Sequence, residues 1–355
     1  AVRLAYVRML TQSQRYADAS RQLERLTSEH PQLPDPWLTL GALRLELKQP
    51  KEAEAALQRF IDLSGAPPSA AVAAANAAGA GRVVSDTEDD DDEPAGPGEA
   101  KDLTAAWLLM AQAAEQRGDL KAAESWLAKV DNPQRLLDVQ VRRAALLARQ
   151  GKVKEARALI QAVPERTGDD ARAKLLAEAQ VLRDIKRWKD ASEVLSAANL
   201  RFSDDTDLIY EQAMVEEKLE RLPEMERLLR RVIALKPDHP HAHNALGYSL
   251  ADRGVRLPEA RDLIKRALEL SPGDPFITDS LGWVEFRLGN RDEALRLLRQ
   301  AHNARPDTEI AAHLGEVLWA LDQRDEARKV WQEARGRDAG NEVLRETLAR
   351  LKVSL

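Results

Sequence analysis

The stretch DSLGWVEFRLGNRDEALRLLRQA, residues 279–301, has the pattern of two amphipathic helices joined by a short turn at Gly289 and Asn290. Apolar residues recur every three or four positions in both halves, which is the spacing of one buried helix face. Gly282 and Ala294 are small residues at positions where a packed helix usually carries more bulk. The stretch therefore predicts a pair of helices in close contact.

The position of Ala294 recurs along the whole chain. Equivalent positions follow a turn and lie 33 to 35 residues apart, except for one gap of 70 residues between Ala53 and Ala123. A fixed period of this length indicates a solenoid, in which each repeat packs on its neighbours. The recurring positions are Ala19, Ala53, Ala123, Ala156, Ala191, Met225, Ala260, Ala294 and Ala327.

The composition is that of an all-α protein. Alanine, leucine, arginine and glutamate dominate the 355 residues, and aromatic residues make up 4%. The absence of cysteine excludes disulfides, zinc–thiolate sites and a cysteine nucleophile. No apolar run approaches the roughly 20 residues of a membrane span. The sequence begins at Ala1 without a signal peptide, so we interpret it as a trimmed or mature fragment.

The net charge of −6 is concentrated in one stretch. The run DTEDDDDE, residues 86–93, carries seven acidic side chains, and the rest of the chain holds 53 basic and 52 acidic residues. The repeats are therefore close to neutral. They lack the basic surface that nucleic-acid binding requires, so we expect no nucleic-acid partner.

The period divides the chain into nine repeats, each with a first helix, a turn and a second helix. Four turns contain a glycine, at Gly118, Gly151, Gly254 and Gly289, and the ninth contains Asp322. Glycine, and less readily aspartate, accepts the left-handed backbone that ends a helix. The repeats are placed at 1–33, 34–65, 104–134, 137–169, 172–205, 206–239, 240–274, 275–307 and 308–340, with a capping helix at 341–355.

The small residues have a structural role in this arrangement. A small residue on the first helix and the recurring alanine on the second allow the two helices to approach closely and cross at a shallow angle. Larger apolar residues further along the second helix fill the shared core. The small residues are Gly41, Ala111, Ala144, Ala179, Ala213, Gly247, Gly282 and Gly315, and the larger ones are Leu57, Leu127, Ile160, Leu195, Leu229, Ile264 and Leu298.

The long gap between repeats contains an insertion at 66–101. It begins with the alanine-rich run GAPPSAAVAAANAAGAG and ends with the acidic run and EPAGPGEA. Such a composition cannot bury enough apolar surface to order itself. We therefore predict that repeats one and two (1–65) are followed by a disordered insertion and then by repeats three to nine (104–340), rather than by an additional folded repeat.

Several repeats resemble the tetratricopeptide repeat (TPR). The segment with Trp37, Leu40 and Gly41 and the segment with Gly247 and Leu250 match its Trp and Leu-Gly positions. A longer match runs through Leu281, Gly282, Gly289, Ala294, Leu298, Ala301 and Pro306. The resemblance implies a right-handed superhelix, with the first helices along its concave face, and a non-catalytic role in binding other proteins.

Helical spacing places one set of first-helix side chains on that concave face. Tyrosine, tryptophan, methionine and arginine are enriched at the centres of protein interfaces, and an asparagine there can both donate and accept hydrogen bonds with a peptide backbone. The alternative is that some of these rings fill gaps between repeats, and the spacing favours neither role for Trp319. The predicted groove residues are Tyr210, Met214, Asn244, Tyr248, Asp279, Trp283, Phe286, Arg287 and Trp319, with Glu217, Asp252 and Glu316 beside them.

The C-terminal repeats also resemble a narrower group. Residues 244–301 are similar to proteobacterial outer-membrane TPR lipoproteins, one of which binds a carboxyl-terminal processing protease and delivers cell-wall hydrolases to it. The resemblance implies a periplasmic adaptor whose partners are a protease and its substrates, tethered through a lipidated cysteine that this sequence does not contain. A cytoplasmic location is the alternative.

The sequence offers no convincing catalytic motif. His239, His241 and His243 alternate, but positions two apart on a helix point to different faces, so we expect no metal site. We expect no cofactor and no enzymatic activity, because phosphate-binding, dinucleotide-binding and zinc-protease motifs are absent. Two alternatives remain: a helical wing of a larger envelope enzyme, and an assembly factor for envelope or polysaccharide export.

Overall fold

The computed structural model describes residues 2–12, 15–65, 103–131 and 135–355. Within these residues the chain forms 19 helices and no strand, which confirms the all-α prediction. None of the described helices is both long enough and apolar enough to cross a membrane. The predicted insertion at 66–101 lies outside the described residues.

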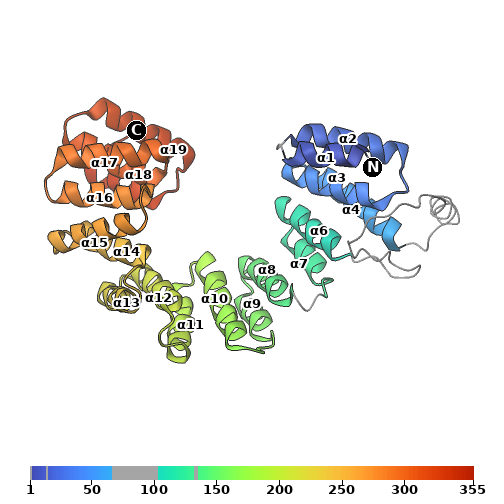
Figure 1. Cartoon of the computed structure of the whole chain (residues 1–355), viewed down its shortest axis with the longest axis horizontal. Coiled ribbons are helices and arrows are strands. Elements are labelled where there is room, and N and C mark those ends of the chain that lie inside the picture. The colour runs from blue at the N-terminus through green and yellow to red at the C-terminus, as the bar shows by residue number, and fades with distance from the viewer. Residues whose placement is uncertain (1, 13–14, 66–102, 132–134) are drawn as a thin grey trace, which may run out of the picture. The chain divides into compact units, whose positions relative to one another are not determined.

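The N-terminal compact unit covers Ala1–Ile185. Its consecutive helices lie side by side: up to α9 each first helix packs against the second helix that follows it, and α10 packs against α8 and α9 (Figure 1). Its helices are α1 (Val2–Gln12), α2 (Tyr16–Glu29), α3 (Pro34–Glu46), α4 (Pro50–Gly65), α6 (Thr104–Gln116), α7 (Leu120–Leu127), α8 (Leu136–Arg149), α9 (Val153–Gln161) and α10 (Gly168–Asp184).

The C-terminal compact unit covers Lys186–Leu355. Its first helices also pack against each other, α14 on α16 and α16 on α18. Its helices are α11 (Trp188–Arg201), α12 (Thr206–Lys218), α13 (Leu222–Leu235), α14 (Pro240–Asp252), α15 (Leu257–Leu270), α16 (Pro275–Arg287), α17 (Arg291–Ala304), α18 (Thr308–Ala320), α19 (Arg324–Arg337) and α20 (Glu342–Leu351).

The turns between paired helices adopt the predicted left-handed backbone. Gly118, Gly151, Gly254, Gly289 and Asp322 all have positive φ, between 61° and 90°. The equivalent turns of three other repeats reach the same conformation without glycine. Their residues, each with φ of 58°, are Lys48, Lys186 and Glu220. Repeats with different turn residues therefore share the same left-handed turn conformation. The packing of the two helices fixes the point at which the chain must reverse direction.

Close helix packing at the small residues is confirmed. A Cβ atom added to Gly282 would lie 2.7 Å from Leu298 Cγ, and one added to Gly247 would lie 2.6 Å from Ile264 Cγ1 and 2.9 Å from the carbonyl oxygen of Ala260. The space left by each glycine is therefore filled mainly by the large apolar residue of the second helix. The recurring alanine brings the backbone close beside it.

Buried carboxylates connect successive helix pairs. Glu178 on α10 accepts hydrogen bonds from Arg157 and Gln161 on α9, at 2.7 and 2.9 Å. Glu285 on α16 accepts one from Arg261 on α15, at 2.7 Å. Both glutamate side chains are nearly inaccessible, at 6% and 3% exposed. Because an unpaired buried carboxylate is strongly unfavourable, each pair fixes how one helix pair sits against the next.

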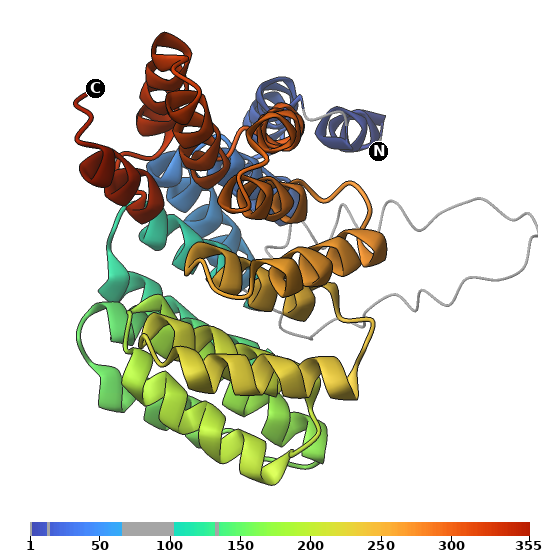
Figure 2. The same ribbon diagram turned by 90° about the vertical axis from the view of Figure 1, so that its left-hand side faces the viewer.

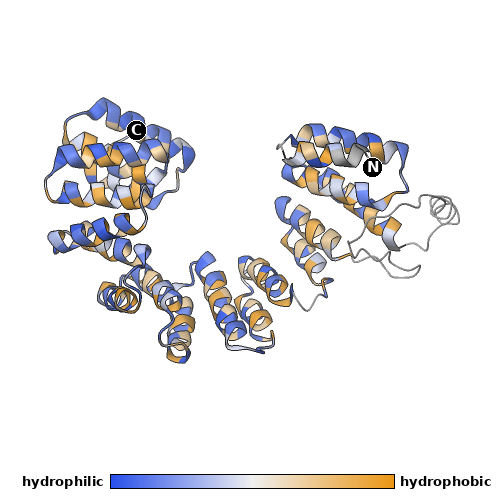
Figure 3. Cartoon of the chain, in the orientation of Figure 1, coloured by the Kyte–Doolittle hydropathy of each residue, from blue (hydrophilic) through white to orange (hydrophobic). Residues whose placement is uncertain are grey.

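The C-terminal helix α20 covers the last repeat. Leu344 is buried with the core residues of α18 and α19, and Val343 and Leu348 pack against the same cluster. Figure 2 shows α20 beside this final helix pair. In Figure 3 the hydrophobic residues of the repeats lie mainly between helices and the hydrophilic ones outside. This agrees with a capping helix that shields an apolar edge.

Candidate functional site

The candidate site lies on the first helices of the C-terminal unit, where His313 on α18 makes polar contacts with two other helices. His313 Nδ1 lies 2.9 and 3.0 Å from the two carboxylate oxygens of Asp279 on α16. Its Nε2 lies 3.3 Å from the hydroxyl of Tyr248 on α14. The indole of Trp283 stacks on the imidazole, with 4.4 Å between ring centroids. One buried histidine thus connects three successive repeats.

The charge of His313 is decided by two opposing effects. Complete burial disfavours the charged imidazolium, but the carboxylate of Asp279 and its hydrogen bond outweigh burial and raise the pKa of His313. Glu316 and Asp252 act in the same direction. In the charged form, Nδ1–H donates to Asp279 and Nε2–H donates to the Tyr248 hydroxyl. Burial raises the pKa of Tyr248, so its hydroxyl stays protonated at neutral pH.

The ion pair between His313 and Asp279 makes the stability of the protein depend on pH. Because the folded-state pKa of His313 is raised, its contribution to stability is complete below the unfolded pKa of about 6.5 and is lost as pH rises through the folded value. We expect the free energy of unfolding to fall as the pH rises above about 6.5, and to fall less in Asp279→Asn. Denaturant titrations of both proteins check this. Equal pH slopes would show that His313 is neutral in the folded protein.

A cavity of about 330 Å³ lies beside this cluster. Its walls come from three first helices and from α20, which closes one side. Among its wall residues, Arg350 is held by Glu316 on α18 through two hydrogen bonds of 2.7 Å each. The residues that line the cavity are Tyr248, Asp252, Trp283, Arg287, His313, Val343, Glu346, Thr347 and Arg350.

Three of the predicted groove residues border this cavity. The side chain of Tyr248 lines the cavity and is half-buried, and the side chain of Arg287 lines it and is exposed. Trp283 also lines it, but only 3% of its surface is exposed. The Trp283 ring therefore packs within the structure, which is the alternative role that the helical spacing left open: the imidazole of His313 stacks on it and the ring of Phe286 lies beside it, at centroid distances of 4.4 and 5.5 Å. Phe286 itself is half-buried against the core.

The other predicted groove residues have different surroundings. Asp279 is 6% exposed and engaged with His313, so it acts within the structure and is not open to a partner. Tyr210 and Met214 are half-buried against the core, and the ring of Tyr210 lies 5.2 Å from that of His239. Asn244 is half-buried and its side-chain oxygen accepts no hydrogen bond within the described residues.

Trp319 does not share this environment. Its ring lies 5.8 Å from that of Trp331 on α19, and the guanidinium groups of Arg324 and Arg328 lie over it at 4.7 and 5.6 Å. The structure therefore places Trp319 against the second helix of its own repeat and not at the groove. Its position in the repeat resembles that of the groove residues, but the side chain turns toward α19.

His313 and Arg350 were missed by the sequence reasoning. The repeat spacing contained the signal, because Asp279 and His313 are 34 residues apart, and so are Glu316 and Arg350. Residues one period apart occupy neighbouring first helices. A search for opposite charges at that separation would have found both pairs.

The alternating histidines have separate structural contacts. His239 precedes α14 and its Nδ1 accepts a hydrogen bond from the backbone of Ala242 at 3.1 Å. His243 Nε2 lies 2.9 Å from the carbonyl oxygen of Pro237. In the described part of the chain no group of three metal-binding side chains is placed to hold an ion.

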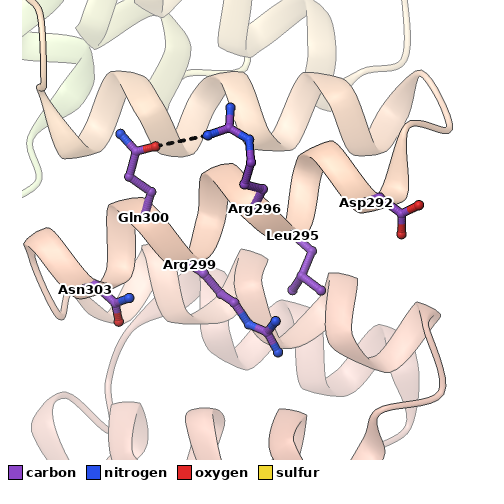
Figure 4. A pocket seen from close by; sticks show the side chains of 6 residues that line it. All are labelled: Asp292, Leu295, Arg296, Arg299, Gln300 and Asn303. Carbon is purple, nitrogen blue, oxygen red and sulfur yellow. Dashed lines mark hydrogen bonds between the residues drawn. The ribbon is translucent and has the colours of Figure 1, made fainter.

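A second, shallower hollow lies on the outer surface of α17. Figure 4 shows its side chains, which are charged or amide groups apart from Leu295. Arg296 is paired with Glu293 at 2.7 Å, and Arg299 with Glu326 at 2.9 Å. The two arginines of this hollow are therefore neutralised by neighbouring glutamates.

Comparison with known sequences decides the family. Models of the tetratricopeptide repeat match residues 210–275 and 280–342, and another model of the same repeat matches residues 2–77. The chain is a tetratricopeptide-repeat protein. Tetratricopeptide repeats generally act as non-catalytic scaffolds for protein interactions, and the repeats of this chain therefore suggest a protein-interaction scaffold.

A curated relative supports the same assignment. A TPR repeat-containing protein of Pseudomonas aeruginosa is 33% identical over 212 residues, which is 60% of this chain and 36% of the relative. This TPR chain therefore corresponds to about a third of that longer protein.

Comparison with solved structures supports the solenoid fold through one of two TPR proteins. A TPR protein of Parabacteroides merdae superposes with a TM-score of 0.51 at 15% identity, covering 68% of this chain and 96% of that one. A thermophilic TPR protein of Thermus thermophilus gives a TM-score of 0.45 at 22% identity, covering 50% and 98%. The first of these matches supports the fold alone.

Proposed function

We propose that this TPR chain is an adaptor that binds a carboxyl-terminal processing protease and presents protein substrates to it. We place it in the periplasm, anchored to the outer membrane through a lipid on the full-length protein. The proposal combines the family's scaffold role with the resemblance of residues 244–301 to outer-membrane TPR lipoproteins. An adaptor needs no catalytic group, since it acts by raising the local concentration of substrate near the enzyme.

The cavity on the C-terminal unit is the observation that best supports a binding role. Arg287 lines it, is exposed, and makes no ion pair or side-chain hydrogen bond within the described residues. Tyr248 borders the same cavity from α14. An exposed arginine beside a tyrosine is the combination enriched at energetically important interface positions.

The test measures binding and cleavage together. Arg287→Ala should weaken binding of the protease or of a substrate by roughly 30-fold, because a central interface arginine commonly contributes about 2 kcal/mol. Arg296→Ala on the outer surface of α17 removes the same charge and should leave affinity unchanged. Each variant is titrated with a purified carboxyl-terminal processing protease from the native host and with its substrate. Cleavage of the substrate is then followed with and without this chain.

The outcomes separate this proposal from its alternatives. Acceleration of cleavage by the wild-type chain, and less acceleration by Arg287→Ala, would support the adaptor. Cleavage by this chain in the absence of protease would contradict it. Recovery of export or secretion components without a protease, in a co-purification from the native host, would instead favour an assembly factor.

A further inference from the structure

Both ring nitrogens of His313 have a partner, but only one of these partners can change its role in a hydrogen bond. Nδ1 lies 2.9 and 3.0 Å from the carboxylate oxygens of Asp279. An ionised carboxylate only accepts hydrogen bonds, so Nδ1 keeps its proton whether His313 is charged or neutral. Nε2 lies 3.3 Å from the hydroxyl of Tyr248, which can donate or accept. The direction of the hydrogen bond at Nε2 therefore depends on the charge of His313.

The charge of His313 in turn determines what the Tyr248 hydroxyl can offer to a ligand. When His313 is charged, Nε2–H donates to the hydroxyl oxygen, and the phenolic O–H is left to donate elsewhere. When His313 is neutral, Nε2 accepts the phenolic O–H, and the hydroxyl keeps only its capacity to accept. Loss of one proton thus converts the hydroxyl from a donor to an acceptor, and neither ring has to move.

The cavity is where this change is felt. The side chains of Tyr248 and His313 both line it, and the hydroxyl makes no other hydrogen bond within the described residues. An O–H group that is half-buried and has no acceptor is unfavourable, so water or a bound group has to accept its proton. The charged form of His313 therefore favours a ligand that accepts a hydrogen bond here, and the neutral form disfavours it.

Several charged groups surround His313. Burial lowers the pKa of His313, but Asp279, Glu316 and Asp252 raise it and prevail. Asp279 is paired with His313 itself, and Glu316 is paired with Arg350. The charged groups around His313 are Asp252 on α14, Asp279 and Arg287 on α16, Glu309 and Glu316 on α18, and Glu346 and Arg350 on α20.

The charges that stay unpaired in the cavity wall indicate a neutral ligand. Within the described part of the chain, Arg287, Asp252 and Glu346 line the cavity and form no ion pair. Because the guanidinium is opposed by two carboxylates, neither a strongly acidic nor a strongly basic group is favoured. A neutral acceptor, such as the main-chain carbonyl oxygen of an extended peptide segment, can accept from the Tyr248 hydroxyl and from Arg287 without this conflict.

We propose that His313 and Tyr248 form a pH-dependent hydrogen-bond gate at this cavity: with His313 charged, Tyr248 donates to a main-chain carbonyl oxygen of a partner peptide, and with His313 neutral it cannot. The proposal rests on the binding role proposed for the cavity and assigns a regulation to the same site. Binding is tightest while His313 is charged. It weakens as the pH rises through the folded pKa of His313, which lies above the ordinary value of about 6.5.

The experiment uses end-blocked peptides without ionisable side chains, so that any pH dependence of binding belongs to the protein. An array of such peptides is screened against the full chain at about pH 6.5, and the tightest binder is titrated at increasing pH. We expect its affinity to fall about tenfold, which corresponds to one hydrogen bond. The fall should coincide with the titration of His313, followed by NMR of the chain with ¹⁵N-labelled histidine.

Two variants test whether the gate causes this fall. Tyr248→Phe keeps the ring and removes the hydroxyl. It should bind about tenfold more weakly than wild type at the lowest pH and should lose little further affinity as the pH rises. Asp279→Asn removes the carboxylate that favours the charged imidazole, so the fall in affinity should move to lower pH.

The matched control is Tyr16→Phe, which removes a hydroxyl from α2 in the N-terminal unit and should stay within about twofold of wild type at every pH. Circular dichroism verifies that all variants keep their helicity. The same pH dependence in Tyr248→Phe and wild type, a neutral His313 at the lowest pH, or no peptide bound would each overturn the gate. Cleavage that the chain accelerates in that case would leave the adaptor role standing. A gated peptide without accelerated cleavage would support the gate and contradict the protease adaptor.

Discussion

Gly315→Ala will destabilise the C-terminal unit by about 3 kcal/mol, although the same change in an open helix is stabilising. Gly315 lies on α18 against the indole of Trp331 on α19. A Cβ atom there would overlap Nε1 and Cε2 of the indole and would lie 2.7 Å from Cδ1. Trp331 is fully buried and its N–H donates to the carbonyl of Ala312 at 3.2 Å, so the rigid ring has no space into which to move. Thermal unfolding followed by circular dichroism measures the loss.

Two companion variants isolate the cause of this effect. Gly336→Ala lies in α19, where an added Cβ meets nothing within 4 Å, and should stabilise the protein by about 0.5–1 kcal/mol. In other repeats an alanine on the first helix faces leucine or isoleucine, as Ala111 faces Leu127. The double variant Gly315→Ala with Trp331→Leu should therefore recover part of the stability lost by the single change. A melting temperature for Gly315→Ala at or above wild type would mean that α18 and α19 are not in this contact.

Arg261→Ala is expected to cost about 3 kcal/mol of stability, because it leaves the carboxylate of Glu285 buried without its cation. Arg261 contacts both carboxylate oxygens, at 2.7 and 3.3 Å, and Asn290 donates to one of them at 2.7 Å. Asn290 remains in the variant, but its neutral amide cannot compensate the negative charge of Glu285. The arginine is 38% exposed and can be hydrated without its partner, whereas the glutamate is 3% exposed and cannot. Equilibrium urea unfolding quantifies the difference.

The matched control is Arg296→Ala on α17. Its ion pair with Glu293 is exposed on both sides, at 60% and 46%, so its loss should cost at most about 1 kcal/mol. Adding Glu285→Gln to Arg261→Ala removes the buried charge and should restore part of the stability. If Arg261→Ala and Arg296→Ala lowered the free energy of unfolding by the same small amount, this would contradict the prediction. It would mean that water hydrates the Glu285 carboxylate in the folded protein.

The groove residues show how far helical spacing can be used. The spacing placed Tyr248 and Arg287 on the concave face, and in the structure both side chains line the cavity. Helical spacing did not show which of the aromatic side chains are exposed and which are buried. Trp283 is covered by His313, and Trp319 turns toward α19, where two arginines lie over it. These contacts depend on which side chains neighbouring helices supply, and a single helix does not contain that information.

The sequence by itself determined the helical repeat, its period, the left-handed turns and the contact made possible by the small residues. Each of these depends on local backbone preference or on a pattern repeated many times, so errors at single positions average out. The tertiary structure alone decided that Asp279 is paired with His313 and Glu316 with Arg350. The physical reason is that charge pairing and burial are set by distances between side chains on different helices. Such distances are fixed only when the repeats pack.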